Sequence, residues 1–546
     1  MDADLASIQN ARTLLRRTHA AQAEFARCTQ DQVDRVVDAM ARAATDHAEE
    51  LAKLAVEESG LGRVASKILK NRFVSIHLHR AYRNLRTCGV VHEDRARGVV
   101  EIATPMGIVA GIIPITNPTS TAIFKILIAL KGRNGIVLSP HPFGVRCIQR
   151  AAEVCRRAAI AAGAPADLIT CMDSPTLEGT QALMKHDLTS VIVATGGPGV
   201  VQAAYSSGKP AFGVGPGNPP VFVHHTADLA HAARCIAASQ GFDYGTICSS
   251  EQSLVVERAV AAAFRAALTA EGAHFCDARE TQLLQRAVQT SDGRLNTKIV
   301  GKSPQVIATA AGFSVPAETT ILIAPERGVG RDFPLSREKL APILAWYECD
   351  EWRSGCDLCI ELIRYYGSGH TMGIYSRDPA VIREFALEKP VARVIVNGPT
   401  TQGSVGYSTN LSPSMTLGCG TMGGNITTDN IGPQHLINIK RVAYPRPEFF
   451  AEMGMTLDRS NLEPGAPAGT PAGPVVIDEG DVGEAKPVAP GAHRRYGGGG
   501  AGAGIEQMIE RALRGARRPP DRNFYDSDRG DGYDFNRSGR LTRPPE

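Results

Sequence analysis

The sequence has little of what marks a membrane-spanning, nucleic-acid-binding or disulfide-stabilised protein. No apolar run reaches the roughly 18 to 20 residues that span a bilayer, and Met1 to Arg16 is polar rather than a basic segment followed by an apolar one. The formal net charge is only +3, so a nucleic-acid partner is not expected. Twelve cysteines without regular spacing favour reduced thiols over a disulfide framework. These absences predict a cytoplasmic protein with no membrane or nucleic-acid partner.

What is present is the pattern of a large α/β protein. A chain of 546 residues is too long for one compact core, so two or more domains are expected. Residues 2–86 show helical periodicity, and from Val99 short β-branched runs alternate with helical stretches. A second alternation runs from about Thr226 to Pro399. Strands alternating with helices predict parallel, doubly wound sheets in two α/β domains.

After about Met455 the composition shifts to Pro, Gly and Ala and then to an Arg/Asp-rich end, which predicts a disordered tail without a core of its own. One segment differs, because residues 504–515 form the pattern of a short amphipathic helix. Its apolar stripe contains five residues at helical spacing: Ile505, Met508, Ile509, Ala512 and Leu513. A helix this short is marginal in water, so we expect the stripe to need a partner surface.

The first stretch with chemical content covers residues 105–125, where a strand runs through a Pro/Asn turn into a helix. Thr119, Ser120 or Thr121 could cap that helix. Polar side chains such as Thr116 and Asn117 would then lie at the carboxyl end of a strand, where open α/β sheets bind ligands. The alternative is a capped helix start with no other role.

The second stretch, residues 194–201, places small residues between a strand and a helix start. Such a turn lets phosphate approach main-chain amides and would suit a dinucleotide. It lacks the G-x-G-x-x-G fingerprint, so the glycines could equally serve only the turn.

The third stretch, residues 241–253, carries Cys248 after a glycine-bearing loop and before a strand. A thiol there can be exposed and its thiolate stabilised by amides, as a covalent catalyst requires. On composition alone, burial as a small hydrophobic residue is the alternative, and Cys248 stands no better than Cys235.

Together with residues 213–218, 247–252 and 417–420, the three stretches resemble the aldehyde dehydrogenase superfamily. Within it they are similar to the CoA-acylating branch, which includes the aldehyde dehydrogenase half of bifunctional alcohol/aldehyde dehydrogenases and microcompartment enzymes. The resemblance covers about residues 15–450. It implies an aldehyde dehydrogenase-like fold with a small oligomerisation element, NAD or NADP as cofactor, an aldehyde and coenzyme A as substrates, and a homodimer or tetramer.

The resemblance also implies roles for individual residues. Cys248 would be the nucleophile, and an Asn side chain would stabilise the oxyanion. Gapless alignment puts Thr116 at the usual Asn position and Asn117 one residue later, so both stay candidates. His370, in a Gly-flanked loop, matches a His of the acylating branch, although a lone His is as often structural as catalytic.

For the cofactor, the resemblance implies contacts from Thr195, Gly196, Gly197, Pro198 and Gly199. It also gives Glu338 a contact with the nicotinamide ribose, the alternative being a solvated carboxylate at a helix start. Ser139 replaces the lysine that contacts the adenosine ribose, so the choice between NAD and NADP stays open.

The most informative departure is an absence. Hydrolytic members carry a water-activating Glu about 34 residues before the cysteine, and this sequence has Gly213 there. Without that base the acyl group would await a thiolate such as that of CoA, which favours a thioester product. A hydrolytic dehydrogenase and an inactive shell-associated scaffold remain the alternatives.

The expected organisation follows from these assignments. The sequence predicts a helical lead-in with NAD(P)-binding domain (1–225), a catalytic domain (226–410), a return segment or oligomerisation element (411–455), a flexible linker (456–503), the amphipathic helix (504–515) and a disordered tail (516–546). That helix resembles encapsulation peptides, which implies a microcompartment shell protein as partner. Cys356 and Cys359 have metal-like spacing without a second ligand pair, so no metal site is expected.

Overall fold

The computed structural model describes residues 2–455. The predicted linker, amphipathic helix and tail (456–546) lie outside the described residues. Of the described chain, the residues to Ala443 belong to one compact unit, and Tyr444 to Met455, which include α17 (Pro447–Glu452), belong to a second.

The predicted helical lead-in is confirmed. It consists of α1 (Ala3–Phe25), α2 (Gln30–Asp46), α3 (Ala48–Ser59) and α4 (Val64–Arg72), which continues through the π-helical turn η1 (Phe73–Leu78) into α5 (His79–Tyr82). A capping box between Thr29 and Gln32 starts α2, and the stripe of Val33, Val36 and Met40 faces the core.

The first sheet has five parallel strands in the order β5-β4-β3-β6-β7. They are β3 (Ile108–Ile112), β4 (Gly135–Ser139), β5 (Ile169–Cys171), β6 (Thr189–Thr195) and β7 (Ala211–Val214), joined through α6 (Pro118–Lys131), η2 (Pro142–Gly144), α7 (Val145–Ala161), α8 (Leu177–Lys185) and α9 (Pro198–Tyr205). Strand order reverses between β3 and β6. That reversal is the switch point at which doubly wound sheets bind ligands.

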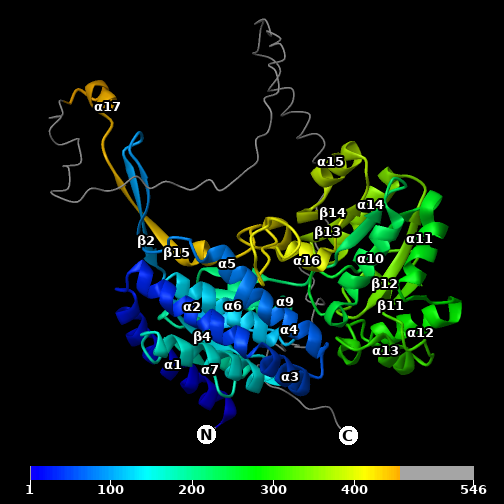
Figure 1. Cartoon of the computed structure of the whole chain (residues 1–546), viewed down its shortest axis with the longest axis horizontal. Helices are drawn as coiled ribbons and strands as arrows, with labels where there is room; N and C mark the ends of the chain where they lie inside the picture. Colours follow the sequence, from blue (N-terminus) through cyan, green and yellow to red (C-terminus); the bar gives the residue numbers. More distant parts are fainter. Residues whose placement is uncertain (1, 456–546) are drawn as a thin grey trace, which may run out of the picture. The chain divides into compact units, whose positions relative to one another are not determined.

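Helices cover both faces of this sheet (Figure 1). Val109 and Val193 pack in one cluster with α2, α6 and α7, whereas Ala110 and Ile192 pack in another with α1, α8 and α9. Both faces are therefore buried, which is why these strands read as continuous apolar runs. The doubly wound prediction is confirmed for this sheet.

The second sheet has seven parallel strands in the order β10-β11-β12-β9-β8-β13-β14. They are β8 (Pro220–Val223), β9 (Ser253–Glu257), β10 (Ala273–Phe275), β11 (Ile321–Pro325), β12 (Ile343–Cys349), β13 (Gly369–Tyr375) and β14 (Val391–Val396). One face packs against α10 (Leu229–Gln240) and α11 (Arg258–Ala270), and the other against α12 (Ala278–Val288), α13 (Pro304–Ala311), α14 (Trp352–Tyr365) and α15 (Pro379–Glu388). Strand β8 precedes the predicted domain boundary at residue 225 and still belongs to this sheet.

A smaller antiparallel sheet, β1-β2-β15, joins distant parts of the chain. In it β15 (Ile437–Ala443) pairs with β2 (Val99–Pro105), which also pairs with β1 (Gly89–Asp94). Strand β15 lies within the predicted return segment, residues 411–455. The remaining short helices are η3 (Phe242–Gly245), η4 (Thr297–Ile299), η5 (Pro334–Ser336), α16 (Thr400–Ser404), η6 (Thr421–Gly423) and η7 (Pro433–Leu436).

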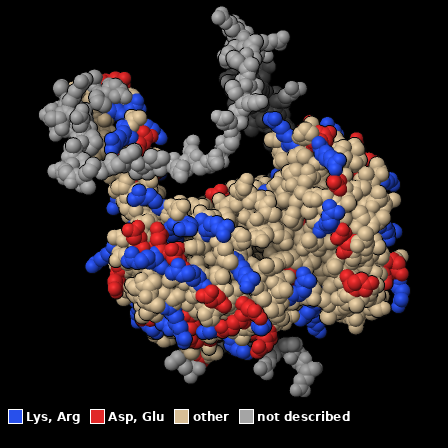
Figure 2. All heavy atoms as spheres, in the orientation of Figure 1, with Lys and Arg blue, Asp and Glu red and all other residues tan. Residues whose placement is uncertain are grey.

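The face of the large unit drawn in Figure 2 carries charged side chains of both signs. On the face drawn in Figure 2, acidic and basic side chains are interspersed over the N-terminal helices. Within residues 2–455, no helix combines the length and the apolar character needed to cross a membrane.

Candidate active site

Cys248 lies between η3 and β9, and a histidine from a distant part of the chain faces it. The Sγ of Cys248 is 3.2 Å from the Nε2 of His370 at the start of β13. Strand β8 separates β9 from β13, so the sheet order brings the two residues together across 122 positions of sequence. The other ring nitrogen, Nδ1, lies 3.1 Å from the Oγ1 of Thr371.

Burial keeps this pair uncharged. It raises the pKa of the Cys248 thiol to about 12, and the nearby carboxylate of Glu338 adds to the rise. Burial also lowers the pKa of His370 to about 3, with the guanidinium of Arg393 acting in the same direction. At neutral pH the site therefore holds a thiol beside a neutral imidazole, an arrangement in which Nε2 can accept a hydrogen bond from Sγ.

A glycine lets the loop after β7 approach both residues. A Cβ added to Gly217 would lie 2.2 Å from the main-chain oxygen of Cys248 and 3.0 Å from the ring of His370. Only a residue without a side chain fits this position.

Thr116 and Asn117 follow β3 and lie next to the cysteine loop. The Asn117 Nδ2 donates to the Thr116 Oγ1 at 3.1 Å and lies 3.4 Å from the main-chain oxygen of Thr246. Asn117 therefore presents its amide group to the loop that carries Cys248, and the Thr116 hydroxyl accepts one of its hydrogen bonds.

The predicted cap of the following helix is wrong. Helix α6 begins at Pro118 with Asn117 at the N-cap position, and no side chain caps it. Thr119, Ser120 and Thr121 therefore lie inside the first turn and are buried. The proline at the first helical position, not a hydroxyl, sets the helix start, because its fixed φ suits that position.

The residues assigned to cofactor binding lie at the ends of the strands beside the switch point. Thr195 ends β6, Gly197 is the N-cap of α9 and Pro198 is its first residue, with no side chain capping the helix. A Cβ on Gly199 would meet nothing within 4 Å, and Gly196 meets only its neighbour Val200. Open main-chain amides at a helix start fit a dinucleotide phosphate.

Ser139 and Gly213 lie on strands of the same sheet. Ser139 ends β4, is buried, and its Oγ lies 2.8 Å from the Oγ1 of Thr180. A Cβ on Gly213 in β7 would lie 2.9 Å from the side chains of Tyr205 and Val201. No side chain, carboxylate or otherwise, fits at position 213 without displacing these neighbours.

Glu338 is buried in the loop before β12 and is not at a helix start, so the solvated alternative is wrong. Its Oε1 accepts a hydrogen bond from the main-chain N–H of Gly217 at 3.0 Å. The same carboxylate contributes to the raised pKa of Cys248. Glu338 is therefore hydrogen-bonded to the loop after β7, and Gly217 of that loop packs against Cys248.

Four charged residues near the cysteine were missed by the sequence analysis. Lys67 and Lys70 come from α4, Asp243 from η3 and Arg393 from β14, and all four are buried. The i, i+3 spacing of the two lysines, which places both on one face of the helix, was an available signal. Their common partner, Asp243, lies more than 170 residues away in sequence and could not be paired with them.

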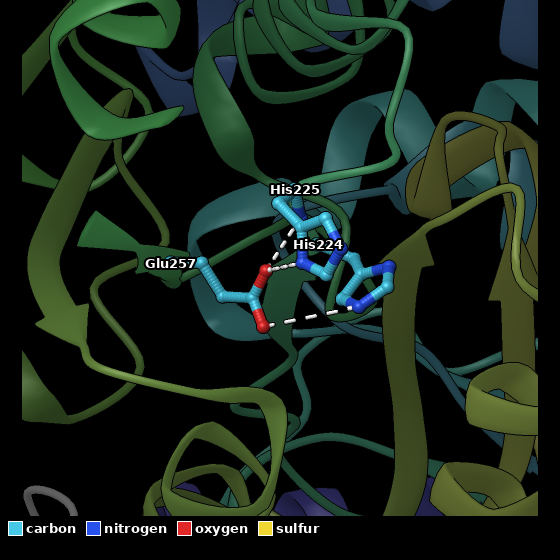
Figure 3. Close-up of side chains that lie close together, drawn as sticks. All are labelled: His224, His225 and Glu257. Carbon is cyan, nitrogen blue, oxygen red and sulfur yellow. Dashed lines mark hydrogen bonds and ion pairs between the residues drawn. The ribbon is translucent and has the colours of Figure 1, made fainter. Parts of the chain in front are cut away.

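Two groups of potential metal ligands lie elsewhere in the described part of the chain, at His224, His225 and Glu257 and at His274, Cys276 and Glu280. In the first group, at the ends of β8 and β9, both the main-chain N and the ring Nδ1 of His225 lie 2.6 Å from one oxygen of Glu257 (Figure 3). His224 is held through its Nδ1 by the hydroxyl of Thr226 at 2.8 Å. These contacts already satisfy the three side chains as a hydrogen-bonded ion pair.

Comparison with known proteins agrees with this geometry. The profile described as "Aldehyde dehydrogenase family" matches residues 2–277. The chain is 46% identical over 435 residues to the bifunctional aldehyde-alcohol dehydrogenase AdhE of Escherichia coli, which covers 79% of this chain and 49% of that protein. The chain thus spans about half the length of the first curated relatives it matches.

Solved structures match nearly over their whole length. An acetylating aldehyde dehydrogenase from Geobacillus thermoglucosidasius is 48% identical, with a TM-score of 0.81 over 82% of this chain and 98% of that one. A propionaldehyde dehydrogenase from a fucose-utilisation microcompartment of Clostridium phytofermentans is 28% identical, with a TM-score of 0.71 over 79% and 97%. The propionaldehyde dehydrogenase of Rhodopseudomonas palustris, with bound CoA and an acylated cysteine, is 27% identical, with a TM-score of 0.72 over 79% and 96%. The chain therefore belongs to the aldehyde dehydrogenase family and is most similar to its acylating members.

Proposed function

We propose that this chain oxidises a small aldehyde to an acyl-CoA through a thioester on Cys248, in a reversible reaction. The observation that carries the proposal is the contact between the partly buried Cys248 and the buried His370, together with Gly213, a strand position where a water-activating carboxylate does not fit without displacing its neighbours. The relative with CoA and an acylated cysteine supports the same chemistry.

In the first step the sulfur of Cys248 adds to the carbonyl carbon of the aldehyde. The thiol proton leaves sulfur, with neutral His370 as the acceptor in reach, and ends on the former carbonyl oxygen. The negative charge on that oxygen meets the Nδ2 of Asn117, a side-chain donor beside the cysteine loop.

In the second step the carbon bound to Cys248 loses a hydride and its hydroxyl oxygen loses a proton, with the neutral Nε2 of His370 as an acceptor, which leaves a thioester on Cys248. When bound, the nicotinamide of NAD or NADP supplies the hydride acceptor. Residues Thr195 to Gly199 would hold its dinucleotide phosphates, and Glu338 would lie near the nicotinamide ribose. Whether NAD or NADP is preferred is decided by assaying both.

In the last step the thiolate of CoA attacks the thioester and Cys248 leaves as the thiolate. Hydrolysis would need a base to activate water, and Gly213 supplies none. Glu338 is engaged by the N–H of Gly217, and CoA, once ionised, needs no general base.

The test is a coupled assay of NADH or NADPH formation with a panel of small aldehydes, plain or bearing an amino or sulfo group, with and without CoA. We expect turnover that requires CoA and disappears in Cys248→Ala. Cys235→Ala, which changes a partly buried cysteine of α10, is the matched control and should retain turnover. Equal turnover without CoA would instead identify a hydrolytic enzyme, and turnover by neither route would favour the scaffold alternative.

We further propose that the enzyme is a homo-oligomer enclosed in a bacterial microcompartment, bound to its shell through residues 504–515. The amphipathic spacing of that segment and the microcompartment source of one relative support this. Deleting residues 456–546 should abolish co-purification with shell protein while leaving CoA-dependent turnover intact. Unchanged co-purification would refute the shell contact, and light scattering would measure the oligomeric state.

A further inference from the structure

Three buried charged side chains form a cluster next to the segment 243–248, which ends at Cys248. Lys67 and Lys70 of α4 both donate to the Oδ2 of Asp243, Lys67 at 3.0 Å. All three side chains are at most 4% exposed. Two ammonium groups against one carboxylate leave one unbalanced positive charge in a low-dielectric environment, where charge acts over a longer range than in water.

The loop is folded around this carboxylate. Asp243 and Tyr244 have φ of +49° and +55°, a left-handed conformation that is unfavourable for residues with a side chain. The Oδ1 of Asp243 compensates by accepting a hydrogen bond from the main-chain N–H of Arg63 at 2.6 Å. Its Oδ2 accepts a further one from Thr246 at 2.8 Å, two residues before the nucleophile.

Lys70 also hydrogen-bonds to Asn117 and to Thr246, two residues before Cys248. Besides Asp243, its Nζ donates to the Oγ1 of Thr246 at 3.2 Å and to the Oδ1 of Asn117. These three contacts use all three donors of the ammonium group.

The contact with Asn117 fixes the direction of its amide. An ammonium group has no acceptor, so the Asn117 atom that faces Lys70 must be the oxygen. The NH₂ group then points to the other side, toward the main-chain oxygen of Thr246 in the cysteine loop. The main-chain oxygen of Thr246 can only accept, so it favours the same orientation, and the amide is fixed from one side by Lys70 and from the other by the cysteine loop.

We propose that Lys70 is a positioning residue for the reaction at Cys248: it holds Asn117 with its NH₂ toward the cysteine loop and offsets the negative charge that develops on sulfur and oxygen. The inference rests on the proposed aldehyde chemistry and adds a residue to its machinery. The electrostatic interaction between Lys70 and Cys248 supports it. Burial lowers the pKa of Lys70 to about 8, so its ammonium form still dominates at pH 7.

The test compares Lys70→Met with Lys67→Met. Each variant removes one lysine and leaves a one-to-one ion pair with Asp243, so both variants change the buried charge by the same amount. Only Lys70 contacts Asn117, whereas Lys67 donates to the main-chain oxygen of Thr116 at 3.0 Å. We expect Lys70→Met to lower kcat at least about tenfold, with the KM for aldehyde within about twofold, and Lys67→Met to have the smaller loss.

A double-mutant cycle with Asn117→Ala separates positioning from general destabilisation. If Lys70 acts through Asn117, adding Lys70→Met to Asn117→Ala should cost much less than its effect alone. Additive losses, or equal losses in the two lysine variants, would overturn the proposal. Thermal unfolding of each variant checks that the fold survives.

A readout that needs neither CoA nor cofactor distinguishes this inference from the proposed function. The rate of Cys248 alkylation by iodoacetamide should fall in Lys70→Met below about pH 8, where Lys70 of the wild type is still mostly an ammonium group, because the thiolate loses a nearby cation. If wild type shows no CoA-dependent turnover while alkylation still falls in Lys70→Met, the proposed function fails and the electrostatic role of Lys70 stands. An unchanged alkylation profile would overturn the role itself.

Discussion

The Nε2 of His370 lies 3.2 Å from the Sγ of Cys248, and burial keeps both groups neutral. The resting pair is thus a thiol beside an imidazole, unlike the thiolate and imidazolium of strongly activated cysteines. The reactive thiolate must therefore form during the reaction, when substrate, His370 and the buried cations act together.

The neutral resting thiol predicts the pH dependence of its reactivity. Because burial raises the pKa of Cys248 to about 12, the alkylation rate of the free enzyme should rise about tenfold per pH unit from pH 7 to 9, without a plateau. Peptide mapping by mass spectrometry would assign the label to Cys248. A plateau near pH 7 would show that the thiolate already exists at rest.

His370 should matter as a proton acceptor. We expect His370→Gln to lower kcat about 100-fold, because an amide can hydrogen-bond to sulfur without taking up its proton. Thr371→Val, which removes only the partner of the other ring nitrogen, is the matched control and should have the smaller loss. A near-wild-type kcat in His370→Gln would assign His370 a structural role.

Asp243 should be required for folding more than for chemistry. Asp243→Asn leaves two buried lysines without a counter-ion and should destabilise the protein by about 3 to 5 kcal/mol at pH 7. Chemical unfolding followed by circular dichroism measures the loss.

The loss should shrink as pH rises from 7 to 10. In the variant Lys70 has lost the carboxylate that favours its protonated form, so its pKa, which burial already lowers, falls further below that of the unfolded chain. The unfolded state then binds more protons, and stability increases with pH in that window. A deficit that stays constant with pH would mean that lost packing, not charge, causes it.

Much of the fold could be predicted because its signals are local. Apolar alternation and strand-to-helix spacing predicted both doubly wound sheets, and the family resemblance of the segment around Cys248 made that residue the candidate nucleophile. The contacts of Lys70 with Asn117 and Asp243 join three segments far apart in sequence, and no local pattern records such a pairing. The prediction of the helix cap was wrong for a related reason. Thr119 and its neighbours are typical cap residues, but the preceding Pro118 starts the helix and places them inside its first turn.

Restoring the missing carboxylate should not create a hydrolase. In Gly213→Glu the new Cβ would lie 2.9 Å from the side chains of Tyr205 and Val201, so these neighbours or the strand must shift to admit any side chain. We expect a lower melting temperature and no CoA-independent turnover. Efficient CoA-independent turnover by a stable variant would show that β7 accommodates the base.

Gly217, in the loop after β7, packs against both Cys248 and His370. In Gly217→Ala the Cβ would lie 2.2 Å from the main-chain oxygen of Cys248, a contact that only movement of the loop or the nucleophile can relieve. Gly215→Ala is the matched control, since its Cβ would meet nothing within 4 Å. We expect Gly217→Ala to lower kcat about 100-fold, because misplacement of a reacting group by about 1 Å costs that much, and Gly215→Ala to retain most activity. Equal kcat values in the two variants would mean that the loop relaxes without moving Cys248 or His370. If Cys248 is alkylated more slowly in Gly217→Ala but not in Gly215→Ala, the loss of kcat arises at Cys248.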